Sequence, residues 1–259
     1  ALVIGLSFTF YLAGTLKAKS GPRTVEKLIV APPSFPKDFK IRIAQISDLH
    51  VGSQIGPAYV TKVVERTNAL NPDLIMLTGD IGDGTPERHI PSIQLLKTLR
   101  AKYGIFYVNG NHEYYRGETE WSQAFKDLGF QVLQNSSATI KVGSTQVSVV
   151  GTTDFQSNLP AALMGVDPAA YKILLAHRPD LADRAAERGV HLQLSGHTHN
   201  GQFIPWTWMI RLFHRYTYGL YKIGSMNLYV NSGTGYWGPA LRLGTQSEIS
   251  LLEVRSVKA

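Results

Sequence analysis

The stretch Leu74-Ile75-Met76-Leu77-Thr78-Gly79-Asp80 decides the fold of this chain. It is a run of four apolar residues that ends at a threonine and a glycine, and a single carboxylate follows. A short apolar run bounded by turn residues is typical of a buried strand. Because open α/β sheets bind their ligands just beyond the carboxyl ends of strands, we expect Asp80 to lie at the centre of a metal site.

The same pattern recurs along the chain, where strand-like apolar runs are followed at once by residues that can bind metal. Residues 41–46, 105–108, 172–176 and 192–194 lead into Asp48 and His50, Asn111 and His112, His177, and His197 and His199, respectively. Each of these side chains alone has an ordinary interpretation as a turn residue, a helix cap or a packed histidine. Five strand ends that all carry such residues favour one shared metal site instead.

Length and composition indicate one large globular domain. The chain has 259 residues, of which 44% are apolar and 17% are charged, enough to bury a full core. It has no cysteine, which excludes disulfides and thiolate metal ligands. The net charge is +7, but six basic and two acidic residues within the first 40 account for +4. The remainder is only mildly basic, which argues against a nucleic-acid partner.

Residues 1–16 contain no charge and are mostly apolar, and Lys17 and Lys19 follow directly. This run is shorter than the roughly 20 apolar residues that cross a bilayer, so we expect a helix that is the end of a transmembrane segment. The alternative is an ordinary buried or surface-lying helix. The basic residues that follow favour a membrane-associated protein with this end on the cytoplasmic face.

Residues 17–38 form a basic, proline-rich segment, which indicates an extended linker with one short strand at residues 25–30. We expect the folded domain to occupy residues 39–259. Helical patterns occur at residues 57–70, 90–99 and 121–128, a β-hairpin at 139–142 and 146–150, and strands at 228–230 and 248–254. This order predicts an α/β fold with two β-layers covered by helices.

The residues at the five strand ends suit a pair of transition-metal ions. Aspartate, asparagine and histidine without sulfur favour Mn²⁺, Fe²⁺ or Zn²⁺ over Ca²⁺ or Mg²⁺. They offer more donors than one tetrahedral ion can use, whereas two ions that share Asp80 can use them all. A metal pair about 3.5–4 Å apart holds the attacking and leaving oxygens in phosphoryl displacement. The sequence therefore predicts two divalent metal ions as cofactors and a phosphoester as substrate.

Five motifs resemble the signature blocks of the calcineurin-like metallophosphoesterase family, and they occur in the family's order. They are Asp48-Leu49-His50, Gly79-Asp80, Gly110-Asn111-His112-Glu113, His177 and Gly196-His197-Thr198-His199. The longer stretch through Asn200-Gly201-Gln202, and the later Asn231-Ser232-Gly233-Thr234-Gly235, are similar to a membrane-associated phosphodiesterase branch typified by the bacterial proteins YaeI and YkuE. The resemblance implies a four-layer α-β-β-α sandwich of two mixed sheets flanked by helices.

The resemblance also implies a role for each residue of these motifs. The implied metal ligands are Asp48, His50 and His199 for a first ion, Asn111, His177 and His197 for a second, and Asp80 as the bridge. A hydroxide held between the ions would attack phosphorus, and His112 would protonate or stabilise the leaving oxygen. His112 and Asp80 are thus the implied catalytic residues.

Two acidic residues beside these motifs have structural explanations. Glu113 stands where many family members carry aspartate, and we expect it to serve the local structure more than to orient His112. Asp83 lies between two glycines, and we expect it to be a turn residue; the alternative is a contact with the metal site.

The sequence between Glu187 and Glu248 contains no acidic residue, which favours an anionic substrate or a phospholipid surface. Within it, residues 205–221 mix aromatic, apolar and basic side chains in the way that suits the headgroup level of a membrane. We expect this segment to be a lid or rim that meets lipid; the alternative is an irregular insertion packed on its own domain. Arg178 and Arg242 are candidates for binding a substrate phosphate.

Together these features predict a membrane-tethered dinuclear-metal phosphohydrolase that cleaves a phosphodiester or a pyrophosphate, with lipid-linked substrates among the candidates. One alternative is a general phosphomonoesterase or nucleotide phosphodiesterase whose anchor only sets its location. Another is a binding module with a silent site, against which the intact Asp80 and His112 argue.

Overall fold

Strand β3 (Leu74–Thr78) lies inside the first of two β-sheets, and all of its residues are buried in the computed structural model, which describes residues 2–256. Its side chains alternate between two cores. Leu74 and Met76 pack between the sheets, whereas Ile75 and Leu77 pack under the helices of the outer face. A strand that is covered on both faces requires a continuous apolar run, and residues 74–77 supply one.

Each sheet has six strands. The first has the order β1 (Arg23–Val30), β12 (Glu248–Arg255), β2 (Lys40–Ile46), β3, β4 (Ile105–Val108) and β5 (Gln131–Val132). The second has the order β10 (Gly219–Ile223), β11 (Met226–Val230), β9 (Leu192–Ser195), β8 (Tyr171–Leu175), β7 (Thr145–Gly151) and β6 (Ser136–Val142). Within them, β2, β3 and β4 are mutually parallel, as are β7, β8 and β9, while β12 and β2 are antiparallel. Both sheets are therefore mixed.

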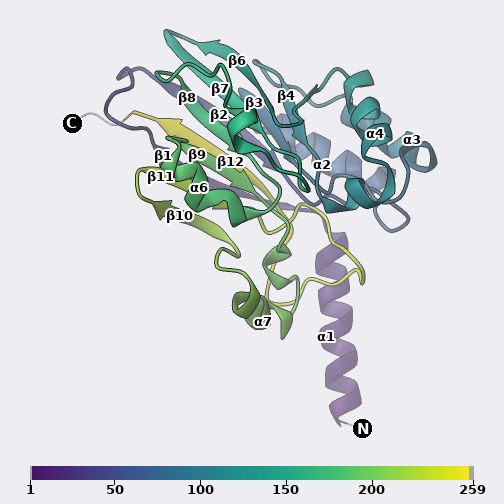
Figure 1. Cartoon of the computed structure of the whole chain (residues 1–259). Coiled ribbons are helices and arrows are strands. Elements are labelled where there is room, and N and C mark those ends of the chain that lie inside the picture. The colour runs from purple at the N-terminus through teal and green to yellow at the C-terminus, as the bar shows by residue number, and fades with distance from the viewer. Residues whose placement is uncertain (1, 257–259) are drawn as a thin grey trace.

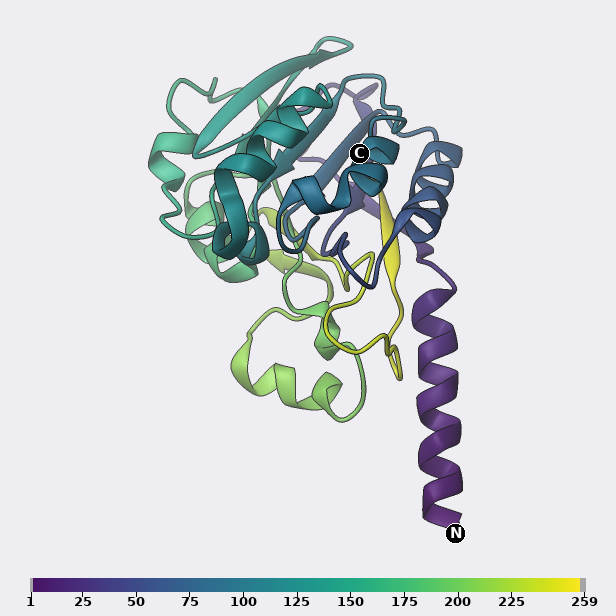
Figure 2. The ribbon, with the colours of Figure 1, turned by 90° about the vertical axis from the view of Figure 1, so that its right-hand side faces the viewer.

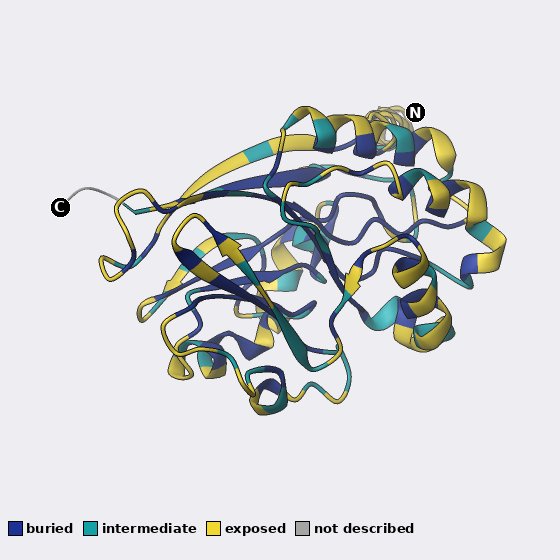
Figure 3. Ribbon diagram, turned by 90° about the horizontal axis from the view of Figure 1, so that it is seen from above, coloured by how far each residue is buried: buried dark blue, intermediate teal, exposed yellow. Residues whose placement is uncertain are grey.

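Helices cover both outer faces of the sheet pair (Figures 1 and 3). The first sheet is covered by α2 (Pro57–Ala69), α3 (Ile90–Leu96) and α4 (Asn111–Asp127), and the second by α5 (Leu159–Ala162) and α6 (Ala182–Glu187). Three short 3₁₀ helices, η1 (Pro86–His89), η2 (Pro179–Leu181) and η3 (His199–Gly201), lie in the connecting loops. The predicted four-layer α-β-β-α sandwich is confirmed.

Helix α4 and strand β1 differ most from their predictions. Helix α4 starts at Asn111, well before the predicted residue 121, and it bends at Gly117, whose φ of 128° is not helical. Strand β1 lies inside the segment predicted as a linker and pairs along its whole length with β12. That part of residues 17–38 thus belongs to the first sheet.

Helix α1 (Leu2–Lys19) projects away from the body of the protein (Figures 1 and 2). Only its C-terminal part is anchored: Ala18 packs into the core under α2, and the backbone N–H of Arg242 donates to the carbonyl of Gly14 at 3.0 Å. The rest of the helix exposes apolar side chains. Among residues 2–256, no helix combines the length and the apolar character needed to cross a bilayer.

Candidate metal centre

The loops that follow β2, β3, β4, β8 and β9 bring the predicted ligands together at one edge of the two sheets. The possible ligand atoms form two main groups, Asp48 with His50 and His199, and Asp80 with His177 and His197. Within each group, the ligand atoms all lie within 4.8 Å of one another. A third such group, of His50, Asp80 and His112, shares His50 with the first and Asp80 with the second. Parallel strands deliver their carboxyl ends to the same edge, which explains why five distant segments meet there.

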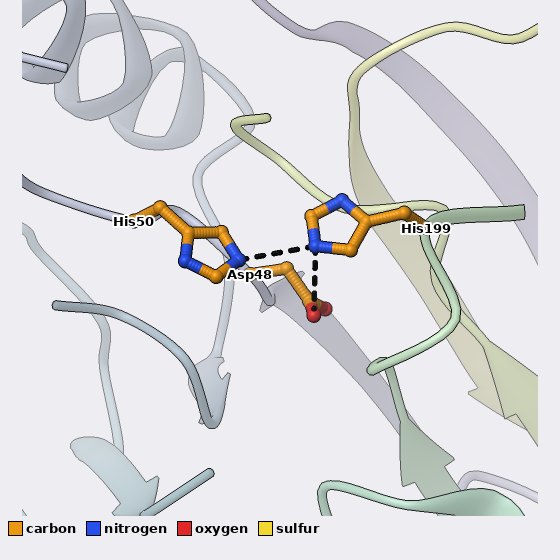
Figure 4. A group of neighbouring side chains, drawn as sticks. All are labelled: Asp48, His50 and His199. Atoms are coloured by element: carbon orange, nitrogen blue, oxygen red, sulfur yellow. Dashed lines mark hydrogen bonds and ion pairs between the residues drawn. The ribbon is translucent and has the colours of Figure 1, made fainter. Parts of the chain in front are cut away.

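The first group has the geometry of ligands to one ion (Figure 4). The Nε2 atoms of His50 and His199 lie 3.0 Å apart, and His199 Nε2 lies 3.4 Å from Asp48 Oδ1. Donors bound about 2.0–2.1 Å from a common ion are themselves separated by about 3.0–3.4 Å. The Nδ1–H of His50 donates to Asp83 Oδ1 at 3.0 Å, which leaves the Nε2 lone pair of His50 directed at this space.

In the second group, two acceptors face each other. His177 Nδ1 lies 2.9 Å from the carbonyl oxygen of Thr78; because a carbonyl can only accept, this nitrogen carries the hydrogen. The Nε2 lone pair of His177 therefore faces Asp80 Oδ2 at 3.2 Å. Neither His177 Nε2 nor the buried Asn111 Oδ1 has a hydrogen-bond partner among the described residues. A cation beside Asp80 Oδ2 would satisfy His177 Nε2, and the unpartnered oxygen of Asn111 is a further possible donor, so the residues fit a metal ion.

The charges of the site oppose the effect of burial. Burial alone would raise the pKa of Asp80 and lower that of His177, but their attraction reverses both: the pKa of Asp80 falls well below its usual range, and that of His177 rises to about 10. His197 and His199 lack such a dominant carboxylate. Burial, together with His177, lowers the pKa of His197 to about 2, and burial also lowers that of His199. Both are therefore neutral, as metal ligands must be, whereas a metal ion at His177 would displace the Nε2 proton that Asp80 otherwise holds there.

The backbone of the site is held in an uncommon conformation. Five of the predicted ligands have left-handed φ angles, namely Asp48 (51°), His50 (54°), Asp80 (51°), His197 (71°) and His199 (51°). Non-glycine residues adopt such angles at a cost, and they cluster at functional sites where the surroundings hold them. At Gly196, an added Cβ would collide with the side chains of Ser47 and Asp48. Only glycine allows the β9 loop to approach the first ligand group this closely.

Glu113 holds the loops after β3 and β4 in place. Its carboxylate is buried and accepts four backbone N–H groups, those of Asp80 (3.0 Å), Ile81 (2.6 Å), Gly82 (3.0 Å) and Gly110 (2.8 Å). The bond from Gly110 also caps α4 and starts it directly after β4. Burial and the nearby Asp80 raise the pKa of Glu113 to about 7. The expected structural role of Glu113 is confirmed.

His112 lies beside the two ligand groups and is oriented by Asp83. Its Nδ1 lies 2.6 Å from Asp83 Oδ1, and its Nε2 lies 4.0 Å from Asp80 Oδ2. Burial opposes protonation of His112, but Asp83 and Asp80 together raise its pKa. The interpretation of Asp83 as only a turn residue is wrong, because the same oxygen also accepts from His50. The sequence signal that could have revealed this role is the position of Asp83, which lies three residues after Asp80 in the same loop.

The two arginines proposed to bind substrate have different surroundings. Arg242 is completely buried and donates to the carbonyl oxygens of His199, Ser232, Gly233 and Gly235. It braces the loops behind the metal centre, and a substrate cannot reach it, so we withdraw it as a substrate contact. Arg178 follows His177 and is held by Asp154 at 2.9 Å, and 32% of its side chain is exposed. It is accessible beside the site.

A cavity of about 1100 Å³ opens over the metal centre. Asp80, Asn111, His112, His197 and His199 form its floor. Its walls include Arg88, Tyr115, Arg116 and Trp237, which the sequence did not single out. These residues come from η1, α4 and the loop before β12, and only the fold brings them over the same floor.

The comparisons with known proteins agree with this geometry. The family described as calcineurin-like phosphoesterase matches residues 41–201, and the chain belongs to this family. The metallophosphoesterase YkuE of Bacillus subtilis is 32% identical over 83% of this chain and 79% of its own length. A protein of Danio rerio named "Transmembrane protein with metallophosphoesterase domain" is 30% identical over 96% of this chain and 61% of its own length.

The chain spans only part of some relatives. It covers 55% of the length of a Caenorhabditis elegans metallophosphoesterase to which it is 34% identical. Among solved structures, a 5'-nucleotidase precursor of Thermus thermophilus superposes with a TM-score of 0.53 at 16% identity, over 84% of this chain and 55% of that one. This likeness shows the shared fold. The family to which the chain belongs is described as one of phosphoesterases, and these relatives are named metallophosphoesterases.

Proposed function

We propose that the protein is a membrane-tethered, dinuclear-metal hydrolase of phosphodiesters or pyrophosphates. The observation that carries the proposal is the pair of ligand groups, which Asp80 connects because it belongs to the second group and also lies within reach of His50 of the first. In the proposed centre, Asp48, His50 and His199 would hold one ion, Asn111, His177 and His197 would hold the other, and Asp80 would be shared by both. The facing acceptors Asp80 Oδ2 and His177 Nε2 support a bound cation at the second position.

The side chains around the ions would divide the chemistry between them. A bound metal pair supplies Lewis acidity and a nucleophilic water at neutral pH. His112, which Asp83 holds through Nδ1, presents Nε2 to the cavity and can donate a proton to the leaving oxygen. Asp83 and Asp80 raise the pKa of His112, which favours its protonated form. Arg178, which Asp154 orients, can bind a non-bridging phosphate oxygen from the side of His177.

A nucleotide phosphodiesterase is the second candidate. The walls of the cavity combine two cations, Arg88 and Arg116, with the aromatic rings of Tyr115 and Trp237. Cations suit a second phosphate, and exposed rings suit a base. The activity of the chain on nucleotides compared with phospholipids separates this candidate from the first.

Helix α1 supports the membrane tether. Its apolar residues occupy all sides of the helix and are largely exposed. A helix that is apolar all round belongs in a core or a membrane, and the body of the protein covers only its C-terminal end. Lys17 and Lys19 at that end favour the cytoplasmic side.

The decisive experiment is a hydrolysis screen of the full chain with Mn²⁺, Zn²⁺ or Fe²⁺ added. The substrates are bis-p-nitrophenyl phosphate, p-nitrophenyl phosphate, nucleotides and dispersed phospholipids. We expect metal-dependent turnover of a diester or pyrophosphate, and about two ions per chain by elemental analysis. A chain that binds two ions but hydrolyses none of these compounds would instead support a binding module.

A further inference from the structure

Helix α7 (Trp206–Phe213) exposes most of its apolar side chains. Thr207 is its only buried residue, while Leu212 is 82% exposed, Phe213 73% and Trp208 62%. Trp206 and Met209 are also exposed. Clusters of large apolar side chains of this kind mark a contact with another molecule or with lipid. Nothing among residues 2–256 covers them.

Helices α7 and α1 extend from the same side of the body (Figures 1 and 2). Two backbone hydrogen bonds explain why, because they attach both helices to one short segment. The backbone N–H of Arg242 donates to the carbonyl of Gly14 in α1, and that of Ile204, just before α7, donates to the carbonyl of Leu243, each at 3.0 Å. Two helices fixed to consecutive residues present their apolar surfaces to the same surroundings.

A basic cavity lies at the C-terminal end of α7. It has a volume of about 400 Å³ and is lined by Arg211, His214, Arg215, Thr217, Tyr218 and Tyr221. No acidic residue is among these lining residues, and the sequence has none between Glu187 and Glu248. Arg215 also pairs with Asp183 at 2.8 Å, with both side chains largely exposed. This charge suits an anionic phosphate group next to the apolar helix.

We propose that α7 is a lipid-binding element that lies in the headgroup region of an anionic phospholipid bilayer. Its apolar residues insert among the acyl chains, and Arg211 and Arg215 bind lipid phosphates. Tryptophan, phenylalanine and leucine beside arginine are the composition of helices that lie at this depth. The inference rests on the membrane location in the proposed function, because α1 inserts into the same bilayer.

The attachment of α7 links this surface to the metal centre. Gly201 follows His199 closely and has a left-handed φ of 69°, and an added Cβ there would meet the backbone of Trp206 and Thr207. The ring of His214, at the other end of α7, lies 5.7 Å from that of the ligand His197. The lipid-facing helix therefore packs directly on the metal-binding loop, which places phosphoesters at the bilayer surface close to the site.

Quenching of tryptophan by brominated lipid tests the insertion of α7 separately from that of α1. The chain has four tryptophans, Trp121, Trp206, Trp208 and Trp237, and none of them is in α1. The full chain is mixed with vesicles of phosphatidylcholine and phosphatidylglycerol whose acyl chains carry bromine. We expect strong quenching that the double variant Trp206→Phe/Trp208→Phe abolishes and that Trp237→Phe leaves in place.

A charge placed on the apolar face provides a matched comparison. Leu212→Glu should reduce quenching several-fold, whereas Met164→Glu, at a residue 78% exposed outside both helices, should not. Both variants should retain wild-type hydrolysis of bis-p-nitrophenyl phosphate and the wild-type Tm. Quenching that persists in Leu212→Glu, or that is absent although the chain sediments with vesicles, overturns the role of α7 while leaving the tether by α1 intact.

The phosphate contact is tested with Arg211→Gln. We expect roughly five-fold weaker binding to phosphatidylglycerol vesicles, as for the loss of one surface cation near an anionic membrane, and no change on pure phosphatidylcholine. Millimolar inorganic phosphate should not compete. If inorganic phosphate displaces the protein from the vesicles, or if Arg211→Gln weakens binding equally to both lipids, the basic cavity does not bind the charged lipid headgroup. Dimerisation of the chain without lipid, abolished by Leu212→Glu, would assign the apolar face to a second copy.

Discussion

The metal centre and the exposed apolar surface of helices α1 and α7 differ in what their side chains contact. At the metal centre, polar residues from five loops are buried and bind one another, as when Asp83 accepts from both His50 and His112. On α1 and α7, apolar residues are exposed and lack cover from the described residues. The polar side chains of the first region mainly bind one another, while the apolar side chains of the second need a cover that residues 2–256 do not supply. A change in either region should therefore leave the other intact.

The largest expected effect is that of Asp80→Asn on turnover. Removing the bridging charge forfeits several kcal/mol of transition-state stabilisation, so we expect a loss of roughly 1000-fold or more in kcat/KM together with a lower metal content. Activity assays and elemental analysis measure the two effects. Vesicle binding should be unchanged. Two ions still fully bound in this variant would contradict the bridging role of Asp80.

His112→Ala separates catalysis from metal binding. We expect a loss of about 10²–10⁴-fold in kcat, the usual contribution of a general acid, with the metal content preserved. Asp83→Asn is the informative partner, because Asp83 also orients His50 and should lower both rate and metal affinity. Loss of metal from His112→Ala would show instead that His112 is a ligand.

Glu113→Gln should destabilise the fold around the metal centre. The new amide group would place donors against backbone N–H groups that now share the carboxylate, and unsatisfied buried groups cost about 1–3 kcal/mol. Thermal unfolding measures the loss as a lower Tm. Glu120→Gln, an exposed change in the same helix, should leave the Tm unchanged. An equal Tm for both variants would rule out the role of Glu113 as a clamp.

The smallest effect is a pH dependence that belongs to neither region. His191 accepts the N–H of Lys172 at 2.9 Å and stacks on Tyr171, and burial lowers its pKa to about 4. Between pH 6.5 and 4 the unfolded chain binds more protons there, so this contribution to stability is present above pH 6.5 and is lost as the pH falls towards 4. His191→Gln keeps an acceptor and should flatten the fall in Tm over this range. An unchanged slope would assign the acid sensitivity to other groups.

Local sequence patterns were sufficient for most of the strands, though not for β5 and β10, and for most of the ligand positions. The complete burial of β3 and β8 follows directly from their apolar runs, and each ligand stands shortly after such a run. The start of α4 was missed because its first turn depends on Glu113 accepting N–H groups from the β3 loop. Long-range hydrogen bonds of this kind leave no periodic signal in the sequence.

The same limit explains the two misjudged charged residues. Asp83 and Arg242 both stand in glycine-containing loops that local patterns describe only as turns or surface. Their roles depend on which loop lies opposite each of them, His112 for Asp83 and the carbonyls behind His199 for Arg242.

The sequence by itself determined the α/β architecture, the family and the residues that can bind metal. Both the pattern of apolar residues and the chemistry of possible ligands are properties of short, continuous stretches of chain. Only the tertiary structure decided which of these side chains lie within reach of one another, that Arg242 is enclosed, and that α1 and α7 point the same way. These are relations between segments far apart in the chain, and packing between the two sheets and their loops sets them.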